Sequence, residues 1–269
     1  MNSRCQEPVG VFDSGLGGLT VVKELIEHLP FEKIVYFGDT ARVPYGTKSA
    51  DTIIRYSREI MRALLKHRVK MVVVACNTAS SLALDVLKKE FDVPMVGVIE
   101  PGARKAATIT RNRKVGIIAT SSTVKSGKYA KKLLQLDKNI QVTSLSCPLF
   151  VPLVEEGWFD HEVTYQVARA YLEDMKKQKI DTLILGCTHY PLLKGVLRDV
   201  MGPGVQLVDS AQEVALQVKD VLSKRSLLRT RLGPAKHLFI VSDEPKQFQR
   251  LALRFLGGGV KDVRRHIYV

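Results

Sequence analysis

The sequence has no long apolar stretch. Its longest uninterrupted apolar run extends only from Met71 to Cys76, whereas a helix that crosses a bilayer needs about 20 apolar residues. The first ten residues, MNSRCQEPVG, contain no hydrophobic segment of the signal-peptide type. We therefore expect a protein of the cytoplasm that has neither a membrane anchor nor a membrane partner.

Cysteine and aromatic residues are also scarce. The four cysteines, at positions 5, 76, 147 and 187, are too few and too widely spaced for a disulfide framework in 269 residues, so we expect free thiols. Lys and Arg (41) outnumber Asp and Glu (27), which gives a net charge of +14. The basic residues form short, scattered clusters with almost no aromatic side chains between them for stacking on bases. This pattern favours a solvated surface, and no nucleic-acid or other protein partner is indicated.

Short β-branched runs alternate along the whole chain with helix-length amphipathic stretches. This alternation predicts an α/β fold with mainly parallel sheets. Apolar stripes at helical spacing predict packed helices at 51–67 and 161–177. The predicted strands are Val9–Phe12, Lys33–Phe37, Met71–Ala75, Met95–Val98, Val115–Ala119, Ile140–Leu145, Thr182–Gly186, Val205–Val208 and His237–Val241.

Two pairs of segments repeat in the same order. The strand that begins at Val9 has a counterpart at Val115, 106 residues later, and the segment that contains Cys76 has one around Cys187, 111 residues later. The repeat predicts two half-molecules of one βα plan, in an arrangement that allows the two halves to face each other. We expect a discontinuous first domain of residues 1–99 plus 210–269, which carries Cys76, and a second domain of residues 100–209, which carries Cys187.

The repeated cysteines fall at the carboxyl ends of predicted strands, where ligands bind in open parallel sheets. Each is followed by polar residues and a predicted helix, as Cys76-Asn77-Thr78 and Cys187-Thr188-His189. A helix N-terminus there would bind a carboxylate and favour a thiolate. The alternative is that both are small buried side chains, but their equivalent places in the repeat favour function. No CxxC or paired-histidine spacing accompanies them, so no metal site is predicted.

A glycine turn follows the first strand, with Asp13 and Ser14 at its start. A dinucleotide loop of the form GxGxxG would need Gly or Ala where Thr20 stands, and Asp13 would face the pyrophosphate, so we predict no nucleotide cofactor. We expect Asp13 and Ser14 to face a small ligand, with Asp13 receiving an ammonium group. The alternative role for Asp13 is a helix cap.

Two further segments occupy comparable places in the two halves. Tyr45 and Gly46 follow the second strand, where Tyr45 can donate its hydroxyl and Gly46 its backbone N–H. In the second half, Glu155 and Glu156 follow Val151-Pro152-Leu153-Val154. If these residues have no functional role, Tyr45 and Gly46 form an ordinary turn, and Glu155 and Glu156 form a solvated helix end.

Taken together, the motifs resemble those of the glutamate racemases in the aspartate/glutamate racemase family, over nearly the whole chain. The motifs are Phe12-Asp13-Ser14-Gly15-Leu16-Gly17-Gly18, Val43-Pro44-Tyr45-Gly46, Ala75-Cys76-Asn77-Thr78-Ala79, Pro152-Leu153-Val154-Glu155 and Gly186-Cys187-Thr188-His189-Tyr190-Pro191. The resemblance implies two pseudo-symmetric α/β domains with the active site in the cleft between them. It also implies conversion of L-glutamate to D-glutamate for peptidoglycan without a cofactor, and we expect a homodimer.

The resemblance also implies roles for individual residues. Cys76 and Cys187 correspond to the two catalytic acid/base groups. Asp13, His189 and one glutamate, Glu155 or Glu156, correspond to auxiliary acid/base groups. The substrate-contacting pairs are Asp13-Ser14, Tyr45-Gly46, Asn77-Thr78 and Thr188-His189.

Elementary chemistry agrees with the two-cysteine assignment. Inversion at an α-carbon without a cofactor requires one group to remove the proton and an opposed group to return one, so a thiolate and a thiol can exchange roles. A racemase for aspartate or another amino acid is the nearest alternative. A cysteine hydrolase built on Cys187 and His189 is a more distant one, because it leaves Cys76 without a task.

Overall fold

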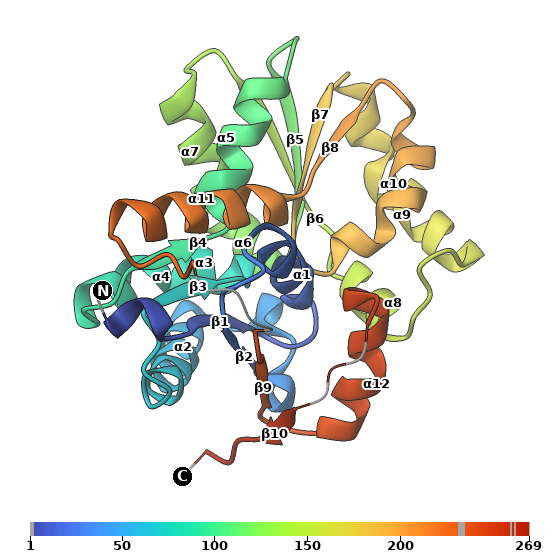
Figure 1. Cartoon of the computed structure of the whole chain (residues 1–269). Coiled ribbons are helices and arrows are strands. Elements are labelled where there is room, and N and C mark those ends of the chain that lie inside the picture. The colour runs from blue at the N-terminus through green and yellow to red at the C-terminus, as the bar shows by residue number, and fades with distance from the viewer. Residues whose placement is uncertain (1–2, 231–234, 259, 261, 269) are drawn as a thin grey trace.

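The structure is a computed structural model that describes residues 3–230, 235–258, 260 and 262–268. It contains two parallel sheets covered by helices (Figure 1). The first sheet has the order β10-β9-β2-β1-β3-β4. Its strands are β1 (Val9–Asp13), β2 (Ile34–Gly38), β3 (Met71–Val74), β4 (Met95–Gly97), β9 (Leu238–Val241) and β10 (Val263–Arg265).

The second sheet has the order β6-β5-β7-β8. Its strands are β5 (Lys114–Ala119), β6 (Gln141–Ser146), β7 (Thr182–Gly186) and β8 (Gln206–Val208). Strands β1 to β4 follow the same spatial order as β5 to β8, so the internal repeat in the sequence corresponds to a repeated topology. Strands β9 and β10 extend the first sheet beyond β2. The domain boundaries near residues 100 and 209 stay predictions.

The sequence analysis predicted the fold class correctly. Each of the nine predicted strands is present, with both ends within one residue of the prediction. The analysis missed only β10 among the strands of the described residues, because the sequence Val-Arg-Arg has no β-branched run. In β1, β2, β3 and β7 every residue is buried, as is usual for parallel strands with helices on both faces.

The helices begin and end for local reasons. In α2 (Ala50–Leu65), the Ser49 hydroxyl caps the N-terminus by accepting a bond from the Thr52 N–H, and apolar residues such as Ile53, Ile60 and Leu64 are buried. The other helices are α1 (Leu19–His28), α3 (Asn77–Leu82), α4 (Leu84–Glu90), α5 (Ile99–Ile109), α6 (Ser121–Lys125), α7 (Lys128–Leu136), α8 (Phe150–Glu155), α9 (Glu162–Lys177), α10 (Lys194–Met201), α11 (Ser210–Lys224) and α12 (Pro245–Leu256), with short 3₁₀ helices at Ser3–Gln6, Thr40–Arg42, Tyr45–Thr47 and Tyr190–Leu193.

The two halves pack against each other over an extended apolar core. One cluster of buried side chains includes Val11 and Val73 in the first sheet and Leu183 and Leu185 in the second. Helix α11 lies across the junction (Figure 1) and contacts both α1 and α5. The carboxyl ends of the central strands of both sheets are thereby held near each other.

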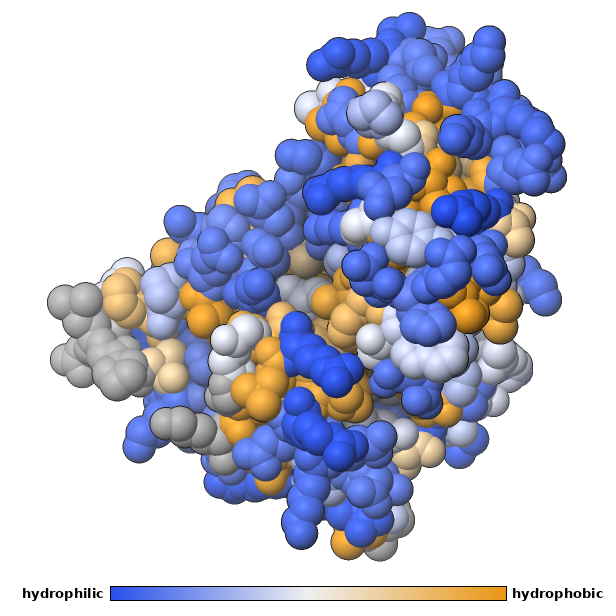
Figure 2. Space-filling view, turned by 90° about the vertical axis from the view of Figure 1, so that its right-hand side faces the viewer, coloured by the Kyte–Doolittle hydropathy of each residue, from blue (hydrophilic) through white to orange (hydrophobic). Residues whose placement is uncertain are grey.

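The outer surface carries few large apolar side chains. On the side of α8, α9 and α12, hydrophilic residues cover most of the surface, and apolar side chains gather toward the middle (Figure 2). The exposed apolar residues here include Trp158, between α8 and α9, and Leu253 on α12. None of the helices in the described part of the chain is long and apolar enough to span a membrane.

Candidate active site

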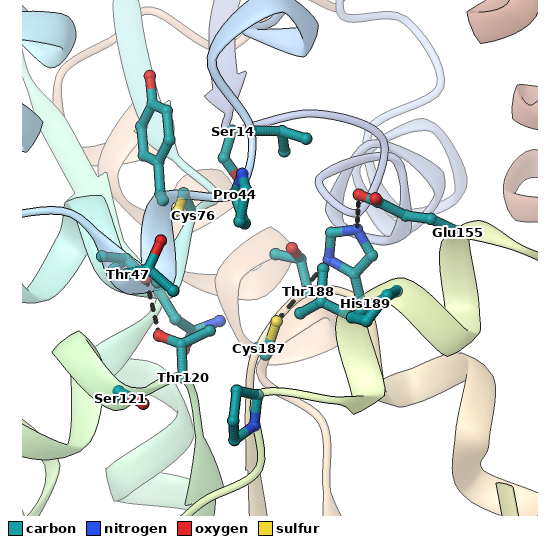
Figure 3. Close-up of a pocket in the computed structure, with 18 residues that line it drawn as sticks. Ser14, Pro44, Thr47, Cys76, Thr120, Ser121, Glu155, Cys187, Thr188 and His189 are labelled. Atoms are coloured by element: carbon teal, nitrogen blue, oxygen red, sulfur yellow. Dashed lines mark hydrogen bonds and ion pairs between the residues drawn. The ribbon is translucent and has the colours of Figure 1, made fainter.

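A cavity of about 270 Å³ lies between the two halves, at the carboxyl ends of both sheets. All the predicted site residues except Asp13 and the alternative glutamate Glu156 line it (Figure 3). These residues are Ser14, Tyr45, Gly46, Cys76, Asn77, Thr78, Glu155, Cys187, Thr188 and His189. Ligand sites of open parallel sheets occur at this position.

Cys76 lies two residues beyond the end of β3, and a helix follows it, as the sequence analysis predicted. Cys76 is the N-cap residue of this helix, α3. Its side chain is almost wholly buried. Burial and the nearby Asp13 carboxylate raise the pKa of the Cys76 thiol to about 12, although bonds from the Ala79 N–H and the Ser14 hydroxyl oppose this change. Cys76 is therefore a neutral thiol at neutral pH.

Cys187 follows β7 and has a different environment. Its Sγ lies 3.7 Å from His189 Nδ1, and His189 Nε2 lies 3.1 Å from Glu155 Oε1. The three side chains form a chain that runs from the cavity to its rim (Figure 3). Burial opposes charge on His189, but its bonds to Cys187 and Glu155 outweigh burial and raise its pKa to about 10. His189 is therefore an imidazolium at neutral pH.

The backbone after Cys187 agrees with the prediction of polar residues followed by a helix. A turn at Thr188 and His189 leads into the 3₁₀ helix Tyr190–Leu193, and α10 begins at Lys194. Pro191 lies in the first turn of the 3₁₀ helix. The charged partner nearest to the Cys187 sulfur is thus a side chain, His189.

Asp13 lies beside the cavity without lining it. It is fully buried, its Oδ2 accepts the Gly15 N–H at 3.0 Å, and its Oδ1 accepts the Thr188 hydroxyl at 3.3 Å. Burial raises the pKa of Asp13, and the positive charge of His189 opposes that effect. These contacts organise the glycine turn and Thr188. Direct contact between Asp13 and an ammonium group stays a prediction.

Partners from other segments hold three of the predicted substrate-contacting residues. The Tyr45 hydroxyl donates to Asp39, so it is directed away from a ligand in the cavity. Asn77 Oδ1 accepts the Tyr129 hydroxyl at 2.8 Å. The Thr78 hydroxyl lies 2.9 Å from that of Thr120. Tyr129 and Thr120 belong to the second half, so the two halves fix each other's cavity residues.

The two candidate glutamates differ in position. Glu155 lines the cavity and contacts His189, whereas Glu156 is exposed and does not line it. The sequence analysis had left this choice open, because adjacent residues at a helix end cannot be told apart by spacing.

The cavity also contains polar residues that the sequence analysis missed. Thr120 and Ser121 line it from the second half (Figure 3). Thr120 lies 106 residues after Ser14, which is the offset of the internal repeat. Applying the repeat to the glycine turn would therefore have identified Thr120. No group of three His, Cys, Asp or Glu residues suited to a metal ion occurs within the described ranges.

Comparison with known proteins agrees with this geometry. Residues 10–218 match the family model described as Asp/Glu/Hydantoin racemase. A protein named glutamate racemase from Geobacter metallireducens is 52% identical over 255 residues, covering 95% of this chain and 94% of the relative. The chain belongs to the Asp/Glu/hydantoin racemase family.

Solved structures of the family have the same fold. Glutamate racemase isoform RacE1 from Bacillus anthracis superposes with a TM-score of 0.93 at 38% identity and covers 97% of both chains. Glutamate racemase from Francisella tularensis, solved in complex with D-glutamate, superposes with a TM-score of 0.91 at 36% identity and covers 98% of both chains. The resemblance noted in the sequence motifs is thus confirmed.

Proposed function

We propose that this chain is a glutamate racemase that interconverts L- and D-glutamate without a cofactor. The observation that carries the proposal is the placement of Cys76 and Cys187, at equivalent ends of two repeated sheets, on one cavity between the two halves. Family membership and relatives named glutamate racemase over nearly the full chain support glutamate as the substrate.

Each turnover moves one proton off the α-carbon and another onto its opposite face. The thiolate of one cysteine removes the α-proton, and the thiol of the other cysteine donates its proton to the carbanion from the far side. The two sulfurs end with exchanged protonation states, so the same pair serves the reverse reaction. Both cysteine side chains are buried, and a site shielded from water keeps a thiolate an effective base.

The two cysteines have different surroundings, and we assign them different roles. Cys76 begins as the thiol acid, because burial and Asp13 raise its pKa to about 12. Cys187 is the proposed base, and His189 Nδ1 lies 3.7 Å from its sulfur. Glu155 supports the imidazolium through Nε2. Asp13, Glu155 and His189 thus act on the two sulfurs as auxiliary groups.

Neutral donors provide most of the polar lining for a dicarboxylate. The cavity presents the hydroxyl-bearing residues Ser14, Thr78, Thr120 and Thr188 and the amide of Asn77, with no Lys or Arg among the lining residues. Preorganised donors of this kind stabilise charge that develops on the α-carboxylate as the proton leaves. Gly46 and the ring of Tyr45, whose hydroxyl is bonded to Asp39, complete the proposed substrate-binding set.

The proposal also covers the metabolic role of the product, the domain boundaries and the assembly. D-glutamate made by this chain would supply peptidoglycan synthesis in the cytoplasm. We assign residues 1–99 plus 210–269 to one domain and residues 100–209 to the other, in agreement with the two sheets. A homodimer is the proposed assembly, and analytical ultracentrifugation would test it.

A circular dichroism time course tests the activity directly. Purified protein without added cofactor is incubated with pure L-glutamate, pure D-glutamate or L-aspartate. We expect both glutamate signals to decay to zero and the aspartate signal to persist. Decay of the aspartate signal alone would reassign the substrate, and stable signals for all three would exclude an amino-acid racemase of this specificity.

The contact between Cys187 and His189 supports a second candidate, a cysteine hydrolase in which His189 activates Cys187 as a nucleophile. Such an enzyme would not need Cys76. A Cys76→Ala variant that retained full activity on an ester or amide, with no racemisation by the wild type, would favour the hydrolase.

A further inference from the structure

A buried carboxylate lies directly behind one wall of the cavity. Asp39 follows β2, is fully buried, and does not line the cavity. Its two oxygens accept bonds from four side chains: Arg42 Nε at 2.7 Å, Ser242 Oγ at 2.8 Å, the Tyr268 hydroxyl at 2.9 Å and the Tyr45 hydroxyl. Asp39 therefore joins a cavity residue, Tyr45, to two residues of the C-terminal part of the chain.

Tyr268 makes a second contact with the same cluster. The Arg42 guanidinium lies between two aromatic rings, 3.9 Å from the centroid of Tyr56 and 3.8 Å from that of Tyr268. Arg42 also pairs with Glu59. Cation–π contacts strengthen when the cation is desolvated, and the Arg42 side chain is only 15% exposed. Tyr268 thus holds Asp39 with its hydroxyl and Arg42 with its ring.

The bond of Tyr268 to Asp39 and its ring contact with Arg42 both affect the loop of residues 43–47. This loop follows Arg42 and forms part of the cavity wall, which includes Pro44 and Thr47 (Figure 3). Arg42 precedes the loop and Tyr45 lies within it, and both bind Asp39. The position of the loop therefore depends on where Asp39 and Arg42 are held, and Tyr268 contacts both of them.

We propose that Tyr268 is a positioning residue for the substrate-binding loop at residues 43–47, acting through Asp39 and Arg42. The inference rests on the proposed function, because it takes the wall formed by this loop to be a substrate contact. Loss of Tyr268 would let the loop shift away from the ligand. Substrate affinity would fall, while the cysteines and their partners stay in place.

Two substitutions separate the contacts of Tyr268. Tyr268→Phe keeps the ring over Arg42 and removes the hydroxyl bond to Asp39, whereas Tyr268→Leu removes both. The matched control is Tyr165→Phe on α9, which removes a hydroxyl that binds Asp160 at 3.0 Å and Asp199 at 2.9 Å, outside the cavity.

The first readout is KM for glutamate, measured well below the unfolding temperature of each variant. We expect KM to rise about threefold to tenfold in Tyr268→Phe and by more than about tenfold in Tyr268→Leu, as expected for loss of a bond to a charged group and then of the whole anchor. Tyr165→Phe should keep the wild-type KM. A purely structural role would lower the amount of active enzyme and the apparent kcat without changing KM, and that result would overturn the proposal.

The second readout does not depend on activity. Hydrogen–deuterium exchange of a peptide that covers residues 39–47 should be faster in Tyr268→Leu than in the wild type, and unchanged in Tyr165→Phe. Unchanged exchange in Tyr268→Leu would overturn the proposal even if the wild type did not racemise glutamate. Lack of wild-type racemisation together with faster exchange would contradict the proposed function alone.

Discussion

The substitution Glu155→Gln should make kcat/KM fall at a lower alkaline pH than in the wild type. His189 owes its raised pKa, about 10, to Cys187 and Glu155, against the opposing effect of burial. In Glu155→Gln the partner 3.1 Å from Nε2 becomes neutral, so the imidazolium is less stable and the pKa of His189 falls. Proton loss from His189 then begins at lower pH.

The size of the fall in the pKa of His189 follows from the contact between His189 and Glu155. A hydrogen bond to a charged partner contributes about 1.5–3 kcal/mol. The Glu155 side chain is 31% exposed, so solvent screening favours the lower end, close to the ~1.4 kcal/mol that corresponds to one pH unit. The pKa of His189 should therefore fall to roughly 9 in Glu155→Gln. If activity requires the imidazolium, kcat/KM at pH 10 should fall about fivefold, with little change from this cause at pH 7.

The assay is the initial rate of conversion of L-glutamate, followed by circular dichroism from pH 7 to pH 11. The neighbouring variant Glu156→Gln is the matched control, because it removes the same charge from an exposed residue outside the cavity. Its profile should match that of the wild type. An unchanged alkaline limb in Glu155→Gln, or an equal change in Glu156→Gln, would refute the assigned role of Glu155.

Further predictions concern the cysteines, a glycine and metal ions. Cys76→Ala and Cys187→Ala should each abolish racemisation, and each variant should exchange the α-proton of only one enantiomer, with opposite preferences, as NMR in D₂O would show. Gly46→Ala should raise KM, because a Cβ there would lie 2.5 Å from Thr120 Cβ, whereas Gly195→Ala, with open space around the added carbon, should leave kinetics unchanged. Dialysis against a chelator should not reduce activity, and restoration of lost activity by zinc would contradict the cofactor-free account. Iodoacetamide should inactivate the enzyme, with glutamate protecting; continued turnover after full modification of both cysteines would contradict the thiol mechanism.

The fold was predictable because its strands are short, apolar and buried on both faces. The runs at Val9 and Met71 differ sharply from the amphipathic helices around them, and the repeat of β1 at β5 identified the two halves. Strand β10, with the sequence Val-Arg-Arg, carries no such pattern. Its place in the sheet depends on pairing with β9, which only the folded chain provides.

The candidate site was predictable where a residue follows a strand directly. Cys187 follows β7 directly and Cys76 lies two residues beyond β3, so both are at the carboxyl ends of their sheets. The partners of these residues were not predictable, because they come from distant parts of the sequence. Tyr129 binds Asn77, and Tyr268 binds Asp39 across 229 positions. No local pattern encodes such contacts.

The stereochemical course of proton exchange in D₂O tests the two-cysteine mechanism most directly. Wild-type enzyme is mixed with protiated L-glutamate, and both enantiomers are analysed by NMR at low conversion. The account predicts that newly formed D-glutamate carries deuterium at Cα, because the opposing thiol has exchanged with solvent, while the remaining L-glutamate keeps its proton. D-glutamate that retained the original proton, or L-glutamate that gained deuterium as fast as the product, would indicate a single base and contradict the account.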